Sequence, residues 1–390
     1  MVRTPEAFRE KQGIDARVFN RVSDIDLRQR QVHGEDLKTG KGWKEPFDHL
    51  LIATGAASIR PPIPGIEAKG VYELNTLQSG IEVRRAVDEE NPRHIVIIGG
   101  GYIGLEMAEN FIHRGIGVTL VEKTPQVMNT LDPDMAALLI KPLEEAEVKL
   151  YLNESLKAFE THGGEVLEVV TDQHRLPADL VLLGLGVRPN SFLAQKAGIS
   201  LGRTGGIRVN DRMQTEMEKI WAAGNCAESF HLVSRRPFYV ALGTVANKQG
   251  RVAGINIAGG RATFPGVVGT AMVKVFSLEV ARTGLQEKEI QDLGLSYGSA
   301  KIDAQTRARY YPGTGPMTVK ILAEKGTGRL LGGQIVGKEG AGKRIDTLAA
   351  ALQAGLTVED LINLDLGYSP PFSGVWDPVQ IAARQAAGQV

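Results

Sequence analysis

The sequence has little of three features that would narrow its class at once: cysteine, a long apolar run, and an excess of charge of one sign. Its 390 residues contain one cysteine, Cys226, which excludes an intrachain disulfide framework and favours a reducing, cytoplasmic location. No stretch reaches the ~20 apolar residues that a membrane-spanning helix needs. Lysine and arginine (45) balance aspartate and glutamate (45), so we expect neither nucleic acid nor a membrane as partner.

Glycine, by contrast, is abundant, and the length of the chain predicts two or three domains. The sharpest glycine motif lies in a predicted strand-helix-strand unit: a buried strand His94–Gly99, a helix Ile103–Arg114 and a strand Gly117–Lys123. Further along, Asp132 and Pro133 predict the start of a helix that continues to about Glu147. Pro142 should kink this helix because it lacks a backbone donor.

The motif itself is Gly99-Gly100-Gly101-Tyr102-Ile103-Gly104, which matches the dinucleotide fingerprint G-x-G-x-x-G in the required context. Gly99 permits the tight turn, Gly101 lets a pyrophosphate approach the helix N-terminus, and Gly104 packs the helix against the strand. Glu122 ends the next strand and can bind an adenosine ribose, which favours NADH. Lys123 beside it keeps NADPH possible, and a glycine-rich turn without a ligand remains the alternative.

Two other segments end apolar strands in glycine turns: Leu51-Ile52-Ala53-Thr54-Gly55-Ala56, and Ile220-Trp221-Ala222-Ala223-Gly224-Asn225. Each alone is compatible with an ordinary turn. From about Phe264, predicted strands follow one another without long helices between them, which is typical of an α+β domain.

Taken in order, and with Leu185-Gly186-Val187-Arg188-Pro189-Asn190, these segments resemble the pyridine nucleotide-disulfide oxidoreductases over essentially the whole chain. The resemblance implies an α/β fold with two Rossmann-like dinucleotide-binding domains, the FAD one incomplete, and a C-terminal α+β dimerisation domain. The implied limits are 1–80 for the first part of the FAD domain, 81–195 for the NAD-binding domain, 196–262 for the second FAD part and 263–390 for the dimerisation domain.

The resemblance also assigns roles to individual residues. Tyr102 matches an aromatic gate between flavin and nicotinamide, and Glu106 matches the acid beside it. The residues that it places at FAD or NAD(P)H are Thr54, Gly55, Gly99, Gly101, Tyr102, Ile103, Gly104, Glu122, Gly186, Asn225 and Ala246.

The C-terminal part is similar to coenzyme A disulfide reductases and related NADH oxidases. The matching segments are Arg309-Tyr310-Tyr311-Pro312-Gly313, Val336-Gly337-Lys338-Glu339-Gly340, Lys343-Arg344-Ile345-Asp346 and Tyr368-Ser369-Pro370-Pro371. In that group two tyrosines of a homodimer reach the partner subunit's thiol-disulfide site, and Tyr310 and Tyr368 match them. The implied acceptor is coenzyme A disulfide, another small disulfide, or oxygen. Without the resemblance, both tyrosines read as half-buried core residues.

The sequence departs from the family in two respects. The family's first glycine motif and its redox cysteine precede the segment that matches Thr4–Arg9, so we expect a shortened form of a larger enzyme with little disulfide reductase activity. Asn225 stands where the family usually has an acid, which weakens the expected bond to FAD. Cys226 is expected to be buried and inert.

Three hypotheses therefore stay open: a flavin-dependent NAD(P)H oxidoreductase of this group, an NADH-binding homodimer without redox turnover, and a reductase of a ferredoxin- or rubredoxin-type protein. The segments of Tyr310 and Tyr368 argue against the third hypothesis.

Overall fold

The computed structural model describes residues 4–390, which form two compact units. Unit 1 comprises the described residues up to 56, with 189–230 and 237–265, and unit 2 comprises 57–188, 231–236 and 266–390. Each unit is thus assembled from stretches that are distant in the sequence, as expected when one domain is inserted into another.

Unit 1 contains a three-stranded antiparallel sheet in the order β1-β2-β3 and a parallel pair, β15-β4. Its elements are α1 (Pro5–Gln12), β1 (Asn20–Asp26), β2 (Gln31–Asp36), β3 (Gly42–Pro46), β4 (Leu50–Ile52), α6 (Phe192–Lys196), β15 (Ile220–Ala222) and α7 (Gly243–Ile257). β1 begins at Asn20, because the residue before it, Phe19, has a φ of 56° that no extended strand adopts.

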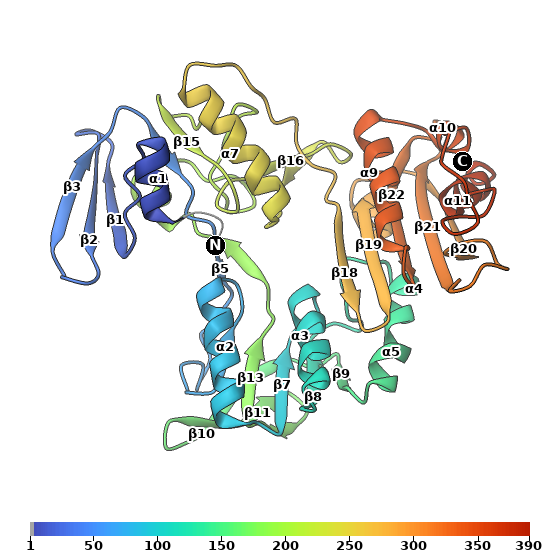
Figure 1. Cartoon of the computed structure of the whole chain (residues 1–390), viewed down its shortest axis with the longest axis horizontal. Helices are drawn as coiled ribbons and strands as arrows, with labels where there is room; N and C mark the ends of the chain where they lie inside the picture. The colour runs from blue at the N-terminus through green and yellow to red at the C-terminus, as the bar shows by residue number, and fades with distance from the viewer. Residues whose placement is uncertain (1–3) are drawn as a thin grey trace. The chain divides into compact units, whose positions relative to one another are not determined.

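The first half of unit 2 is a parallel sheet in the order β6-β13-β7-β8-β9, with α2 and α3 alongside it (Figure 1). The elements are β6 (Val71–Glu73), α2 (Leu77–Glu90), β7 (His94–Ile98), α3 (Tyr102–His113), β8 (Gly117–Glu122), β9 (Lys149–Leu152) and β13 (Leu180–Leu183). The apolar residues of β7 are buried on both faces, which confirms the interpretation of this segment as a central strand. β6 lies inside the range 1–80 that we assigned to the FAD domain, and it pairs with β13 in this sheet.

Within the described residues, seven further strands lie in the segments between the elements named so far and the C-terminal sheet. They are β5 (Ala56–Ser58), β10 (Leu156–His162), β11 (Glu165–Thr171), β12 (Arg175–Pro177), β14 (Val187–Pro189), β16 (Ser229–His231) and β17 (Arg236–Phe238). The strands β10, β11 and β12 form an antiparallel sheet of their own, and β5 pairs with β14.

The helix expected from Asp132 to Glu147 is broken as Pro142 predicted. It consists of α4 (Pro133–Ala136), a 3₁₀ turn η1 (Ala137–Leu139) and α5 (Ile140–Glu145). Pro142 cannot donate to the carbonyl four residues earlier, so the ladder is interrupted at the 3₁₀ turn. The expected capping by the Asp132 side chain is wrong, because its carboxylate is bound elsewhere in the unit.

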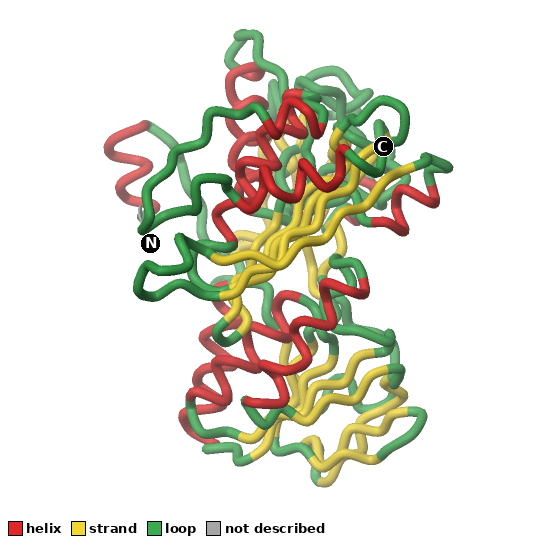
Figure 2. Tube along the Cα trace, turned by 90° about the vertical axis from the view of Figure 1, so that its right-hand side faces the viewer, coloured by secondary structure: helices red, strands yellow, loops and turns green. Residues whose placement is uncertain are grey.

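The second half of unit 2 is a five-stranded antiparallel sheet in the order β18-β19-β22-β21-β20. Its elements are β18 (Ala271–Val275), β19 (Leu278–Gly284), α8 (Glu287–Asp292), β20 (Tyr297–Gln305), β21 (Pro316–Glu324), β22 (Leu330–Gly337), η2 (Gly342–Arg344), α9 (Ile345–Ala354), α10 (Val358–Ile362) and α11 (Pro378–Ala387). Helices cover one face of this sheet (Figure 2). Val273, Val275, Val280 and Val336 join the core of the parallel-sheet half.

No helix within the described residues 4–390 combines the length and apolar character that crossing a bilayer requires.

Candidate functional site

The glycine turn between β7 and α3 is built from three glycines with different surroundings. Gly99 has a φ of 108°, and a Cβ there would lie 2.5 Å from the carbonyl oxygen of Gly184. A Cβ on Gly104 would lie 1.9 Å from the carbonyl oxygen of Gly99, so helix and strand approach as closely as backbones can. A Cβ on Gly101 would meet nothing within 4 Å. The turn is therefore closed at two glycines and open at the third, which is the arrangement a pyrophosphate requires.

The first turn of α3 offers backbone donors at this opening. Gly101 is the N-cap residue and provides no side-chain acceptor. The N–H groups of Tyr102, Ile103 and Gly104 have no partner within the helix by the geometry of an α-helix. Together with the positive end of the helix dipole, they suit an anionic group of a dinucleotide.

Glu122, at the end of β8, is 6% exposed, and its carboxylate binds the glycine turn. Its Oε2 accepts a hydrogen bond from the Gly100 N–H at 2.7 Å. Its Oε1 accepts from the Thr124 N–H at 3.0 Å, from Thr124 Oγ1 at 2.7 Å and from Asn129 Nδ2 at 3.4 Å. The sequence did not single out Thr124 and Asn129, whose roles depend on how the loop after β8 folds back.

Tyr102 and Glu106 lie on the first two turns of α3. Thr130 Oγ1 donates to the Tyr102 hydroxyl at 3.1 Å, and burial raises the pKa of this phenol, although the bond from Thr130 opposes the shift. The pKa of Glu106 is also raised, first by loss of surrounding water and then by the negative charge of Glu109. Tyr102 therefore stays neutral, and Glu106 holds a proton more readily than an ordinary glutamate.

Gly186 follows β13, the strand next to β7 in the parallel sheet. Its φ is 85°, and a Cβ there would meet nothing within 4 Å. Since the carboxyl ends of parallel strands share one edge of a sheet, Gly186 and Gly99 both lie at the edge that carries ligands in such folds.

In unit 1 the second group of expected residues gathers at the ends of β4 and β15. These strands pair in parallel, with Ile52 opposite Ala222. After β4, Thr54 Oγ1 donates to the carbonyl oxygen of Asn190 at 2.5 Å, and the Asn190 N–H donates to the Gly55 carbonyl oxygen at 3.0 Å. The φ of 71° at Gly55 lets the chain turn here without a steric cost.

After β15, the amide oxygen of Asn225 is buried and has no hydrogen-bond partner among the described residues. The preceding residue, Gly224, donates its N–H to Gln249 Oε1 at 2.8 Å. A Cβ on Gly224 would lie 3.5 Å from that of Ala246 in α7, so helix and turn are in close contact. A buried acceptor without a donor is costly unless a ligand supplies one.

Cys226 is fully buried, as we expected. Its Sγ lies 3.4 Å from the carbonyl oxygens of Ile52 and Ala223, to which it donates weak bonds. The thiol is thus engaged inside unit 1 and is not accessible for thiol-disulfide exchange.

The structure brings Tyr310 and Tyr368 together on the surface of unit 2. Tyr310 is 77% exposed, so the alternative of a half-buried core residue is wrong for it, whereas Tyr368 is 49% exposed. The pKa of Tyr310 is raised, first by partial loss of water and then by the neighbouring Tyr368 hydroxyl.

Arg344 holds the two tyrosine loops in place, a role that the sequence did not reveal. Its Nη2 donates to the carbonyl oxygens of Thr306 and Phe372, both at 2.7 Å, and its Nε binds Asp377 at 2.9 Å. One guanidinium with its rigid set of donors therefore joins three separate segments.

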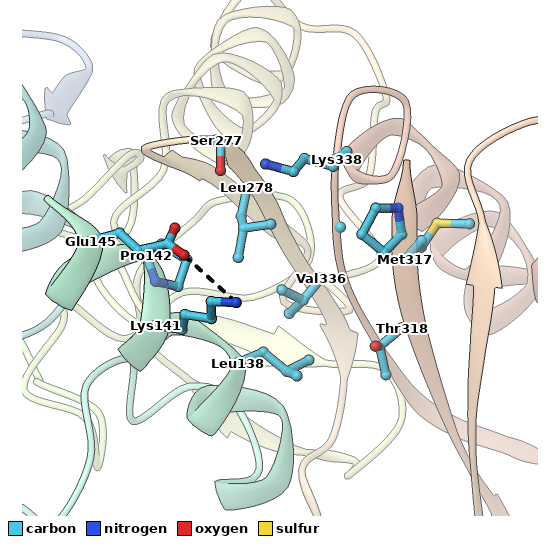
Figure 3. Close-up of a pocket in the computed structure, with 12 residues that line it drawn as sticks. Leu138, Lys141, Pro142, Glu145, Ser277, Leu278, Met317, Thr318, Val336 and Lys338 are labelled. Carbon is cyan, nitrogen blue, oxygen red and sulfur yellow. Dashed lines mark ion pairs between the residues drawn. The ribbon is translucent and has the colours of Figure 1, made fainter. Parts of the chain in front are cut away.

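A pocket of about 320 Å³ lies elsewhere in unit 2, and no residue expected at the site lines it (Figure 3). Its floor is apolar, with Leu138, Leu278 and Val336. Lys141 at its rim pairs with Glu145 at 3.6 Å, so part of its charge is already compensated.

Comparison with known proteins identifies the family. Residues 3–250 match the family described as pyridine nucleotide-disulphide oxidoreductase, and residues 270–378 match its dimerisation domain. The chain belongs to this family. It is 40% identical over 385 residues to a protein named NAD(P)H coenzyme A polysulfide/persulfide reductase from Pyrococcus horikoshii, covering 97% of this chain and 84% of the relative.

Two further similarities support the assignment. A protein named NADH oxidase from Methanocaldococcus jannaschii is 36% identical over 390 residues, covering 99% of this chain and 86% of the relative. The solved structure of an NAD-dependent persulfide reductase from A. fulgidus superposes with a TM-score of 0.95 at 38% identity, covering 99% of this chain and 72% of that one.

Family membership makes the chain an oxidoreductase that uses FAD and NAD(P)H. The residues present fit both groups. The opening at Gly101 accommodates a pyrophosphate that any side chain would obstruct, and the unpartnered oxygen of Asn225 offers an acceptor to a hydroxyl.

Proposed function

We propose that this protein passes hydride from NADH to FAD, from which two electrons go on to a coenzyme A disulfide, persulfide or similar small disulfide, or to oxygen, and that the disulfide reaction is slow because Cys226 is buried. The observation that carries the proposal is the glycine turn of unit 2, with Gly101 open beside the first turn of α3 and Glu122 fixed at the end of the next strand. We further infer a cytoplasmic location from the single buried cysteine.

In this proposal the pyrophosphate of NADH binds the N–H groups at the start of α3, and the adenosine ribose binds Glu122. A carboxylate has about four acceptor positions, and Glu122 already accepts from Gly100, Thr124 and Asn129. The bond from Asn129, at 3.4 Å, is the longest and is the one that a ribose hydroxyl would displace. NADPH stays possible because Lys123 next to Glu122 is exposed.

FAD, when bound, supplies the electron carrier between the nicotinamide and the acceptor. Thr54 and Gly55 would lie at its phosphates, and the Asn225 amide oxygen would accept a hydrogen bond from its ribityl chain. Ala246, at the close contact between α7 and Gly224, would leave room for the ring system. We place Tyr102 and Glu106 beside the nicotinamide, with Ile103, Gly104 and Gly186 lining the same edge of the sheet.

The exposed aromatic surface of unit 2 supports a homodimer. Tyr310, Tyr368, Phe372, Val375 and Trp376 are between 45% and 77% exposed, and apolar patches of this kind mark interfaces. Since the matched dimerisation domain contains all of them, we propose that the patch is buried against a second copy. The Tyr310 and Tyr368 hydroxyls would then reach the partner's disulfide site.

The first experiment is the visible spectrum of the purified chain before and after anaerobic addition of NADH. Flavin absorbance that bleaches with NADH would support the proposal, and reoxidation by coenzyme A disulfide or by oxygen would identify the acceptor. Tyr310→Phe should then slow the disulfide reaction and leave bleaching unchanged. NADH binding without flavin or turnover would instead support an NADH-binding homodimer.

A further inference from the structure

The loop from Lys123 to Leu131 connects the coenzyme turn to the rest of unit 2. Thr124 and Asn129 bind the carboxylate of Glu122, as described above. The Met128 N–H donates to the Gly100 carbonyl oxygen at 2.8 Å, and Thr130 holds the Tyr102 hydroxyl. Every described hydrogen bond to the Glu122 carboxylate or to the Tyr102 hydroxyl therefore comes from this loop or from the glycine turn.

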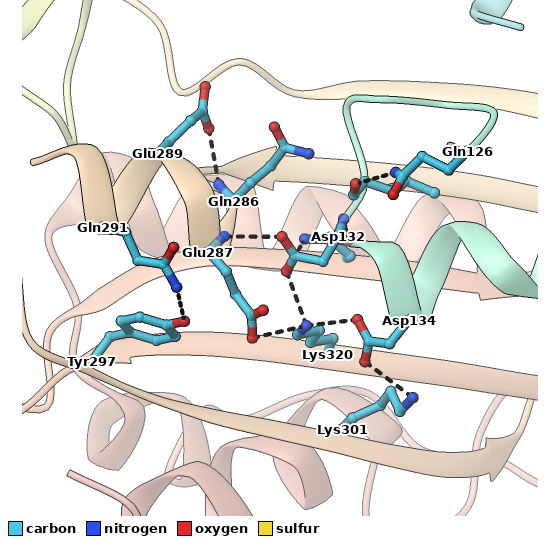
Figure 4. A network of polar contacts seen from close by, with 12 residues as sticks. Gln126, Asp132, Asp134, Gln286, Glu287, Glu289, Gln291, Tyr297, Lys301 and Lys320 are labelled. Carbon is cyan, nitrogen blue, oxygen red and sulfur yellow. Dashed lines mark hydrogen bonds and ion pairs between the residues drawn. The ribbon is translucent and has the colours of Figure 1, made fainter. Parts of the chain in front are cut away.

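Asp132 directly follows the loop, is 2% exposed and is bound by residues of the antiparallel sheet (Figure 4). Gln334 recognises both its backbone and its side chain: Oε1 accepts from the Asp132 N–H at 2.8 Å, and Nε2 donates to Asp132 Oδ2 at 2.7 Å. The N–H of Glu287, at the start of α8, donates to Asp132 Oδ1 at 2.9 Å. These bonds fix Asp132 from two directions.

Lys320 adds charge to this anchor. It is 3% exposed, and its Nζ lies 3.1 Å from Asp132, 2.7 Å from Asp134 and 3.0 Å from the Glu287 carboxylate. A second hydrogen bond reaches the loop further back along the chain: Gln286 Nε2 donates to the Asn129 carbonyl oxygen at 3.0 Å.

We propose that Gln334 on β22 and Lys320 on β21, both in the antiparallel sheet, are positioning residues for the coenzyme site. They fix Asp132, Asp132 fixes the loop, and the loop fixes the Glu122 carboxylate and the Tyr102 ring. The inference rests on the proposed function, because it assumes that NADH binds at this turn. Its consequence is that the antiparallel sheet sets both the affinity for NADH and the preference for NADH over NADPH.

The loop can lose one polar contact without unfolding, because its apolar residues are buried in the core of the parallel-sheet half. Val127 is fully buried, and Met128 and Leu131 are 1% exposed, all within the core of the parallel-sheet half. A lost hydrogen bond at Gln334 should therefore let the polar groups of the loop shift while the fold persists. Glu122 would then be held less firmly, and its charge would discriminate less against a 2′-phosphate.

The test compares NADH and NADPH binding, by calorimetry, in the unaltered 390-residue chain and in Gln334→Met, which keeps the side-chain length and removes both hydrogen bonds. We expect the Kd for NADH to rise roughly three- to thirtyfold, as for other residues that couple to a site through a network. The ratio of the Kd for NADPH to that for NADH should fall, whereas general destabilisation would weaken both coenzymes equally. Gln286→Ala, at a partly buried position, should act in the same direction with a smaller effect.

Asp303→Asn is the matched control, since Asp303 accepts a bond from Thr318 Oγ1 at 2.8 Å on the same sheet and has no described contact with the loop. It should change neither Kd by more than about twofold. Unchanged NADH and NADPH affinities in Gln334→Met would overturn the inference and leave the proposed function standing. A wild-type chain that binds no NADH would instead overturn the proposed function, and the inference with it.

Discussion

Replacing Lys320 by methionine removes one charge from the centre of unit 2 and keeps the length of the side chain. Burial lowers the pKa of Lys320, but its bonds to Asp134 and Glu287 and the charge of Asp132 outweigh burial and raise this pKa above its usual value. Lys320 is therefore charged at neutral pH, and three carboxylates depend on it. Removing one partner from a buried ion network costs about 3–5 kcal/mol, and we expect a loss of this size for Lys320→Met.

The loss should depend on pH, with a sign that follows from Asp134. Burial raises the pKa of Asp134, but Lys320 and Lys301 more than reverse this and lower it below 3.8. A lowered carboxylate pKa gives stability that is present above the ordinary value and is lost as the pH falls through the folded value. In Lys320→Met the carboxylates accept protons more easily, so its deficit should be largest near pH 7 and smaller near pH 4.

The assay is hydrogen exchange of peptides from β21 and β22, which reports the free energy of opening in this unit alone. Lys301→Met is the control, because Lys301 is 42% exposed and pairs with Asp134 at 3.0 Å on the surface. It should cost less than about 1 kcal/mol. Equal effects of the two substitutions, or a Lys320→Met deficit that grows on acidification, would refute the reasoning.

Three further predictions follow from single positions. Gly104→Ala should destabilise unit 2 by about 1–3 kcal/mol, because its Cβ would lie 1.9 Å from the Gly99 carbonyl oxygen, whereas Gly101→Ala should melt normally and bind NADH more weakly in calorimetry. Asn225→Asp should retain more flavin through gel filtration, since a charged acceptor forms a stronger bond; equal retention would contradict the placement of Asn225. Burial, with the charge of Arg282, lowers the pKa of His231 from 6.5 to about 4, so unit 2 should lose about 3 kcal/mol as the pH falls through this range. His231→Gln should remove that part of the pH dependence in denaturant titrations.

The parallel-sheet half of unit 2 could be predicted because its signals are local. A buried strand, a glycine turn and an amphipathic helix follow one another within residues 94–114, and the structure confirms each. The helices α1 and α11 were not predicted, although their signals were present: Thr4-Pro5 and Asp377-Pro378 are each an N-cap followed by a first-turn proline. The strand β19 was not predicted, because the two-residue turn that separates it from β18, Phe276-Ser277, contains neither glycine nor proline to mark it.

The candidate site was predictable only in its contiguous parts. The glycine motif and Glu122 lie within 24 residues of one another, and their spacing is set by one strand-helix-strand unit. Gln249 and Arg344 act through contacts with residues 25 and 38 positions away, respectively. Their roles depend on tertiary packing that no spacing rule encodes.

Asp132 shows why a correct local rule can give a wrong side-chain role. The sequence Asp-Pro predicts an N-cap, and a helix does begin there, with the Asp132 backbone in the extended conformation of a cap residue. Its carboxylate does not cap the helix, since Gln334, 202 residues further on, donates to it from Nε2 and accepts from the Asp132 backbone N–H through Oε1. A buried carboxylate is stable only where donors and a cation compensate it, and Lys320 supplies that cation. The cost of burying Asp132 is therefore met by the antiparallel sheet, which makes the loop beside Glu122 dependent on that sheet.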